Sequence, residues 1–201
     1  MIRMRSCLGV DLEEMEHPTK KLLRSEVKKV LAGLSEDERA AASEEICRRI
    51  EGLPEWGEAQ MVALYAAQAA EPNLFSLLGK SGKAFCFPRV AGEELEFHRC
   101  DSKELLVVGQ WGLLEPDAGK CAVVAAPEID LICVPGLAFT RTGGRLGRGG
   151  GFYDRFLIGS HPRAVKAGIC FHAQLVEALP LEGHDHEVDL VVTDQEIIAC
   201  K

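Results

Sequence analysis

Gly143-Gly144-Arg145-Leu146-Gly147-Arg148-Gly149-Gly150-Gly151-Phe152-Tyr153-Asp154-Arg155 is the stretch of this sequence that decides the fold. It follows residues 131–139, an apolar run interrupted by Pro135 and Gly136 that is typical of a buried strand leading into a loop. The glycine-rich stretch is therefore predicted to lie at the carboxyl end of a strand.

The residue types in this stretch indicate a cradle for phosphate and metal. Glycine lets the backbone reach positive φ and bring successive N–H groups close to an anion. Arg145 and Arg148 add forked donors that suit phosphate oxygens, and Asp154 offers the hard oxygen that Mg²⁺ prefers. The alternative is a flexible glycine loop with solvated arginines, although a linker seldom ends in an aromatic and acidic helix start.

Outward from this stretch, helix and strand patterns alternate. Residues 19–31 show apolar positions at helical spacing with a stop at Gly33, and Ser35 with Glu38 forms a capping box that opens a helix to about Gly52. Buried or half-buried strands are predicted at 61–65, 84–87, 95–98, 131–134, 165–170 and 188–192, with a short helix at 73–78 and loops at 115–119 and 179–183. The alternation predicts an α/β layered sheet, whose strand order the pattern does not give.

Composition narrows the class of protein. The chain has 201 residues, 47% of them hydrophobic, which suits one compact domain. A net charge of −8 argues against a nonspecific nucleic-acid binder, and no apolar run is long enough to span a bilayer. The eight cysteines are scattered without a CxxC pair, so we expect free thiols in a reducing cytoplasm.

Three motifs stand out at residues 135–139 (PGLAF), 144–149 (GRLGRG) and 151–154 (GFYD). Together they resemble the signature of the 5-formyltetrahydrofolate cyclo-ligase family. Weaker matches extend over nearly the whole chain, at Lys20, Arg24, Glu71, Pro88-Arg89, Glu115-Pro116, His184-Asp185, Asp189 and Val192-Thr193. The resemblance implies a three-layer, Rossmann-like single domain over residues 19–201, with a mostly parallel sheet flanked by helices. Residues 1–18 are predicted to be an N-terminal extension.

The resemblance also implies an activity: ATP- and Mg²⁺-dependent closure of 5-formyltetrahydrofolate to 5,10-methenyltetrahydrofolate in the cytoplasm, through a phosphorylated formyl group. It implies ATP contacts from Lys20, Arg24, Gly144, Arg145, Leu146, Gly147, Arg148, Gly149, Gly150, Gly151, Phe152 and Tyr153. It implies folate contacts from Glu71, Arg148 and Phe152, catalytic roles for Arg145, Arg148 and Tyr153, and Mg²⁺ ligation by Asp154 and Asp189. We expect no nucleic-acid or membrane partner, and a monomer or weak homo-oligomer.

Several of these residues have plainer interpretations. Lys20 and Arg24, four apart, also fit a solvated basic helix face, and Glu71 also fits an acid that balances a helix dipole. Trp111 is predicted to line the pocket because a large aromatic among glycines is poorly explained by core filling, whereas Phe85 and Phe87 fit the core better.

Two further motifs are weak. Gly79-Lys80-Ser81 fails as a Walker A loop because the leading glycine would fall at Leu74. The segment His184-Asp185-His186 with Asp189 has no cysteine or third histidine nearby, as a transition-metal site would need. His98 and His172 are also predicted to be structural.

The sequence departs from the family pattern at Asn73-Leu74, where Asp-Thr is often found, and at three further positions. Thr140 stands for Asp, Gly150 for the Lys of some members, and Phe152 for the more frequent Tyr. Two other classes of function remain open. One is a noncatalytic nucleotide-binding module that keeps the cradle. The other is a sugar-phosphate isomerase or CoA-transferase-like enzyme on a related fold, which would need neither ATP nor Mg²⁺.

Overall fold

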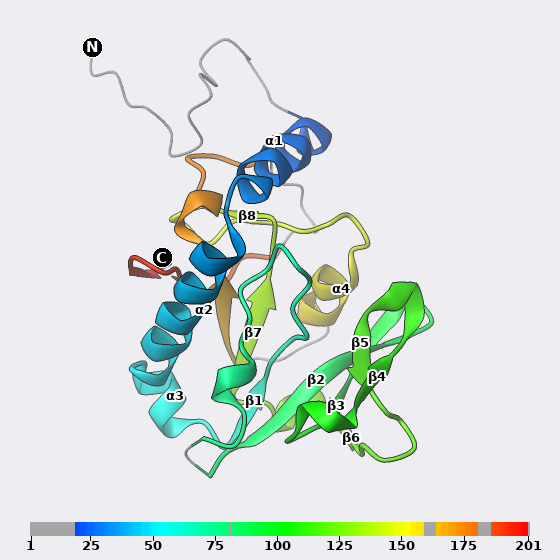
Figure 1. Cartoon of the computed structure of the whole chain (residues 1–201). Coiled ribbons are helices and arrows are strands. Elements are labelled where there is room, and N and C mark those ends of the chain that lie inside the picture. Colours follow the sequence, from blue (N-terminus) through cyan, green and yellow to red (C-terminus); the bar gives the residue numbers. More distant parts are fainter. Residues whose placement is uncertain (1–18, 81, 159–163, 181–185, 201) are drawn as a thin grey trace, which may run out of the picture.

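The fold is built around an eight-stranded, mostly parallel sheet (Figure 1). A computed structural model describes residues 19–80, 82–158, 164–180 and 186–200. The strand order is β12-β11-β10-β7-β1-β2-β3-β6, in which the five central strands β11, β10, β7, β1 and β2 run parallel. The outer strands β12 and β3 pair antiparallel to β11 and β2. The predicted α/β class is therefore confirmed.

The elements have the following bounds. The sheet contains β1 (Met61–Ala63), β2 (Ala84–Ala91), β3 (Glu94–Arg99), β6 (Val123–Val124), β7 (Leu131–Pro135), β10 (Val165–Ile169), β11 (Leu190–Val192) and β12 (Ile197–Ala199). Two-stranded ribbons are formed by β4 (Leu106–Val108) with β5 (Leu114–Pro116), and by β8 (Ala138–Phe139) with β9 (Arg145–Leu146). The α-helices are α1 (Lys20–Ala32), α2 (Glu36–Glu51), α3 (Pro54–Glu58) and α4 (Phe152–Ile158).

Local sequence explains the two long helices. Thr19 caps α1 by accepting from the Leu22 amide, and Gly33 ends it, as the spacing predicted. The capping box at the start of α2 is present: the Glu38 amide donates to the Ser35 hydroxyl, and the Ser35 amide donates to the Glu38 carboxylate. Both helices bury one apolar stripe, which fixes the face that each turns to the sheet.

Successive residues of the central strands face opposite layers of core. Val62 and Cys133 pack in the core under α1, α2 and α3, whereas Ala63 and Val134 pack in the core under α4. Figure 1 shows α2 and α3 along one side of the sheet and α4 on the other. The result is the predicted three-layer arrangement. No helix among the described residues is long and apolar enough to cross a bilayer.

Some expectations need correction. The helix predicted at 73–78 is a single 3₁₀ turn at Phe75–Leu77. The first residues of the loop predicted at 115–119 belong to strand β5. The apolar run 131–139 is split at Gly136 into β7 and β8. A Cβ at Gly136 would lie 2.7 Å from the Phe139 ring, so the bend has no room for a side chain. The seven described cysteines are free, as expected. The predicted extension 1–18 and the predicted loop residues 181–183 lie outside the described residues.

Candidate active site

The glycine-rich stretch begins in the tight turn of the β8–β9 hairpin. The Thr140 hydroxyl accepts from the Gly144 amide (2.9 Å) and the Thr140 amide donates to the Gly144 carbonyl (2.9 Å). Thr140, which departs from the family pattern, therefore closes the turn with its own side chain. Gly143 has φ +93°, and a Cβ there would lie 2.4 Å from the Val188 carbonyl, so the hairpin tip requires glycine.

After β9 the chain runs through Gly147 to Gly151 and enters α4. Gly149 (φ +109°) and Gly151 (φ +68°) adopt conformations that other residues rarely reach. The described structure places this run, the β7 end and the β4–β5 ribbon around one pocket. Its lining includes Tyr65, Gln68, Glu71, Pro88, Val90, Leu95, Trp111, Leu113, Glu115, Pro135, Gly136, Arg145, Gly147, Arg148, Gly150, Gly151, Phe152, Tyr153 and Asp154. Strand carboxyl ends are where α/β folds generally bind ligands.

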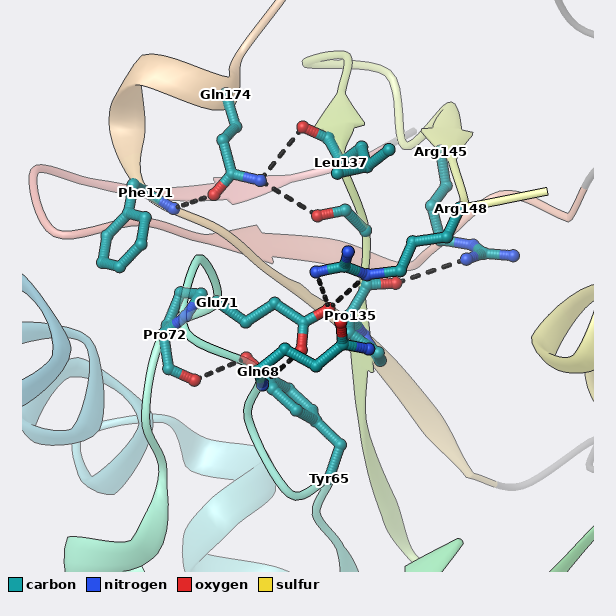
Figure 2. Close-up of polar contacts among 11 residues, drawn as sticks. Tyr65, Gln68, Glu71, Pro72, Pro135, Leu137, Arg145, Arg148, Phe171 and Gln174 are labelled. Atoms are coloured by element: carbon teal, nitrogen blue, oxygen red, sulfur yellow. Dashed lines mark hydrogen bonds and ion pairs between the residues drawn. The ribbon is translucent and has the colours of Figure 1, made fainter. Parts of the chain in front are cut away.

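Arg145 is a buried cation at the floor of this pocket. Its guanidinium lies 2.5 Å from an Asp154 carboxylate oxygen and donates to the Pro135 carbonyl (3.2 Å; Figure 2), and its side chain is 3% exposed. The guanidinium also lies over the Tyr153 ring, 5.8 Å from the centroid. Among the described residues Arg145 Nε has no hydrogen-bond partner. One donor of a buried cation is thus available to an anion.

Arg148 and Glu71 form an ion pair across the pocket (Figure 2). Arg148 Nε and its terminal nitrogen lie 2.9 and 2.8 Å from Glu71 Oε1, and Glu71 Oε2 accepts from the Gln68 amide (2.9 Å). The Tyr65 hydroxyl donates to the Pro72 carbonyl (2.9 Å), which anchors the loop that carries Glu71. The sequence did not single out Gln68 or Tyr65, because their contacts are set by the loop conformation.

Helix α1 supplies a third cation. Arg24 Nε donates to the Gly147 carbonyl (3.0 Å), so this side chain is turned to the glycine run rather than to solvent. Lys20 lies one turn earlier on the same helix face. The basic-face interpretation fits the exposed Lys21, Lys28 and Lys29 instead.

Tyr153 carries a buried hydroxyl that has no hydrogen-bond partner among the described residues. Burial, and then the negative charge of Glu71, raise the pKa of Tyr153 well above its ordinary value. The phenol is therefore a neutral O–H donor at physiological pH, and an unpaired buried donor is a costly feature unless a ligand accepts from it.

The structure brings Trp111 to the pocket and leaves Phe85 and Phe87 in the core, as expected for each. Trp111 sits at the tip of the β4–β5 ribbon with a left-handed backbone (φ 55°), and its side chain is largely exposed. Its ring lies 5.6 Å from the ring of Phe152. An exposed indole on a strained backbone beside a second aromatic is a suitable wall for a flat ring.

Asp189 is not brought to the pocket, and its joint assignment with Asp154 needs correction. It precedes β11, at the amino-terminal edge of the sheet, where its carboxylate accepts from the Lys166 amide (2.7 Å) and lies 3.3 Å from Lys166 Nζ. Asp154 lies in the lining of the pocket at the opposite edge. No cluster of three or more His, Cys, Asp or Glu side chains suitable for a metal occurs within the described residues; His184 and Asp185 are not among these.

Residues set aside by the sequence have ordinary structural roles. Lys80 pairs with Glu51 (2.5 Å) away from the pocket, in agreement with its rejection as a P-loop lysine. His98 is buried with Nδ1 2.9 Å from the Cys121 carbonyl. Burial raises the pKa of the Cys86, Cys133 and Cys170 thiols, so these stay protonated and unreactive.

Fold and site together define an α/β enzyme with a glycine-rich, arginine-bearing turn beside an aromatic-walled pocket. A family model described as the 5-formyltetrahydrofolate cyclo-ligase family matches residues 16–194, and the chain belongs to this family, whose members are ligases. The probable 5-formyltetrahydrofolate cyclo-ligase of Schizosaccharomyces pombe is 29% identical over 89% of this chain and 97% of its own. The corresponding enzyme of Saccharomyces cerevisiae is 28% identical over 87% and 94%.

Solved structures agree with this assignment. The 5,10-methenyltetrahydrofolate synthetase of Aquifex aeolicus superposes with a TM-score of 0.80 at 35% identity, over 90% of this chain and 93% of its own. A 5,10-methenyltetrahydrofolate synthetase from Mycoplasma pneumoniae superposes with a TM-score of 0.71 at 22% identity, over 87% and 98%, which supports the fold. The isomerase and CoA-transferase alternatives and the noncatalytic module have no support from these comparisons.

Proposed function

We propose that this protein converts 5-formyltetrahydrofolate and ATP to 5,10-methenyltetrahydrofolate, ADP and phosphate. The observation that carries the proposal is the convergence of Arg145, Arg148 and the glycine run on one side of a pocket whose other side is apolar and aromatic. The first side suits a triphosphate and the second suits a reduced pterin. Membership of the cyclo-ligase family supports the same pair of substrates.

The proposed chemistry activates a poor leaving group. The formyl oxygen attacks the γ-phosphorus of ATP, the bond from that phosphorus to the ADP oxygen breaks, and an iminium phosphate forms. N10 of the folate then bonds to the formyl carbon and loses its proton, and the carbon–oxygen bond breaks to release phosphate. The protein contributes positioning and charge neutralisation, which is the main demand of phosphoryl transfer.

We assign the phosphate contacts to the glycine-run amides, Arg145 and Arg148. Arg145 is the preorganised member, because Asp154 and the Pro135 carbonyl already fix its guanidinium. Arg148 is the more exposed member, and moving from Glu71 to a phosphate would free that carboxylate to face the folate. Arg24 of α1, which donates to the Gly147 carbonyl, and Lys20, one turn earlier on α1, complete the cationic side of the pocket.

Asp154 fits a Mg²⁺ that is shared with ATP. Mg²⁺ in nucleotide sites takes one or two carboxylates and completes its shell with phosphate oxygens and water, so a single aspartate in the pocket is sufficient. The ion would neutralise charge on the phosphates. Asp189 is left out of this proposed site because of its position at the other edge of the sheet.

A coupled assay tests the proposal. Purified protein with Mg²⁺ and ATP is expected to release ADP only when 5-formyltetrahydrofolate is present, in step with the absorbance of the methenyl product. ADP release without the folate, or methenyl formation without ATP, would contradict it. For variants of Arg145 and Arg148 in this assay, Lys80→Ala is the control, since Lys80 pairs with Glu51 outside the pocket.

A further inference from the structure

Glu115 is a buried carboxylate in the wall of the pocket with an unused acceptor. Its side chain, on β5, is 4% exposed, and Oε1 has no hydrogen-bond partner among the described residues. The guanidinium of Arg89 lies 3.8 Å from Oε2, beyond hydrogen-bond distance, and donates instead to the Pro116 carbonyl (2.9 Å). A buried carboxylate oxygen left in this state costs free energy that a donor on a ligand would recover.

The β4–β5 ribbon is shaped to admit this side chain. A Cβ at Gly109 would lie 2.3 Å from Glu115 Oε2, so the carboxylate occupies the space that any other residue at 109 would fill. The Gly109 amide donates to the Leu113 carbonyl (2.7 Å), which holds the ribbon tip closed around it. Gly109, one of the glycines that flank Trp111, therefore has a role in seating Glu115.

The surroundings of Glu115 in the pocket are apolar. Pro88 and Val90 of β2, Leu95 of β3, and Leu113 with Leu114 of the ribbon line the same pocket. The arginines and Glu71 belong to the glycine run and the loop after β1. A carboxylate among apolar walls makes stronger hydrogen bonds than one in water, and it selects ligands that present adjacent N–H donors.

We propose that Glu115 is a specificity-determining residue that accepts hydrogen bonds from the aminopyrimidine edge of the folate's bicyclic ring. That edge carries an exocyclic amino group next to a ring N–H, two donors in the spacing that a carboxylate accepts. This role rests on the proposed function, and it specifies which part of the folate is recognised on the β5 side of the pocket. The Arg89 guanidinium, 3.8 Å from Oε2, places a positive charge beside this carboxylate.

The test combines a change in the protein with a change in the ligand. Affinities of the wild type and of Glu115→Gln are measured by calorimetry for 5-formyltetrahydrofolate and for an analogue whose 2-amino group is replaced by methyl. We expect the wild type to bind the analogue about 10- to 100-fold more weakly. In Glu115→Gln this discrimination is expected to fall below about threefold, with KM for the folate raised and KM for ATP unchanged.

The control is Glu96→Gln on β3, whose side chain is half exposed and which is expected to leave discrimination intact. Equal discrimination by the wild type and Glu115→Gln would overturn the inference and leave Glu115 as a partner of Arg89. If Glu115→Gln does not fold, Glu115→Asp, which keeps the charge and withdraws the oxygens, enters the same comparison. A wild type that does not bind the folate at all contradicts the proposed function, whereas a wild type that binds both ligands equally contradicts this inference alone.

Discussion

The two edges of the sheet use aspartate in opposite ways. At the amino-terminal edge, Asp130 and Asp189 each precede a strand and accept from the first amides of a neighbouring strand: Asp130 from Gln60 and Met61 (2.8 and 2.9 Å), and Asp189 from Lys166 (2.7 Å). At the carboxyl-terminal edge, Asp154 pairs with the buried Arg145. Asp130 and Asp189 thus complete backbone hydrogen bonds, whereas Asp154 balances the charge of an arginine that faces the pocket.

The same contrast extends to neighbouring polar groups. Arg145 Nε, the Tyr153 hydroxyl and Glu115 Oε1 are buried, line or adjoin the pocket, and lack partners among the described residues. The carboxylates of Asp130 and Asp189 instead accept hydrogen bonds from main-chain amides. The other unsatisfied buried side-chain atoms among the described residues, on Arg49, His98 and His172, each lie within 4 Å of a carboxylate. The three groups at the pocket edge therefore distinguish a ligand site from structural polar contacts without reference to any relative.

The largest expected effect is on turnover when the aspartate of the pocket edge is altered. Asp154→Asn is expected to lower kcat about 10³-fold, because it removes a charge that positions Arg145 and binds the proposed ion. Asp189→Asn is expected to keep kcat within about threefold, since it is remote from the pocket and partly exposed. Steady-state kinetics measure kcat of both variants. Equal losses of kcat would contradict the contrast between the two edges of the sheet.

The next effect concerns two arginines that pair with glutamates in different places. Arg148→Ala is expected to lower kcat/KM about 10²-fold by removing a phosphate contact, with little change in the unfolding free energy. Arg141→Ala, whose partner is Glu196 beyond the hairpin, is its control and is expected to leave kcat/KM unchanged. A similar loss in both would assign the effect to general surface charge instead of the pocket.

Stability carries the third effect. Asp130→Ala is expected to lower the free energy of unfolding by about 2 kcal/mol, because two amides lose their acceptor where β1 begins. Since Asp130 is far from the pocket edge, kcat is expected to stay at the wild-type value in urea-free buffer. Urea unfolding monitored by circular dichroism measures the first quantity, and a fall in kcat without a fall in stability would reverse the assignment.

The smallest effect sharpens the same comparison with a single atom. Tyr153→Phe removes a buried hydroxyl that has no described partner, so the free protein is expected to keep or slightly gain stability. Turnover is expected to fall about tenfold if a ligand accepts from that hydroxyl. Thermal unfolding with and without ATP and folate measures both parts. A loss of stability in the free protein would mean that the hydroxyl is already paired.

The sequence predicted the elements whose signals are local. The capping box at Ser35 and the apolar spacing before Gly33 placed α1 and α2 to within a residue or two, and apolar runs placed the central strands. It did not predict the β4–β5 ribbon, because Leu106–Val108 and Leu114–Pro116 pair with each other outside the main sheet and carry no clear alternation. Strand order also needed the structure, since it depends on contacts between distant segments.

The site was predictable where residues lie together in sequence and less so elsewhere. Arg145, Arg148, Tyr153 and Asp154 follow one strand end, so a single motif places them all at the pocket. Asp189 has the residue type of a metal ligand, but it lies at the start of the predicted strand 188–192, and a parallel strand starts at the edge opposite to the pocket. The buried state of Glu115 depends on Gly109 and Arg89, which come together through folding of the ribbon.

The hydrogen bond from Arg24 to the Gly147 carbonyl joins positions 123 residues apart. During synthesis, the amino-terminal helix leaves the ribosome long before the turn that it will contact has been translated. Closing so long a stretch of chain costs conformational entropy that one hydrogen bond does not recover. The cationic side of the pocket is therefore complete only once the whole chain between α1 and the glycine run has been synthesised and packed.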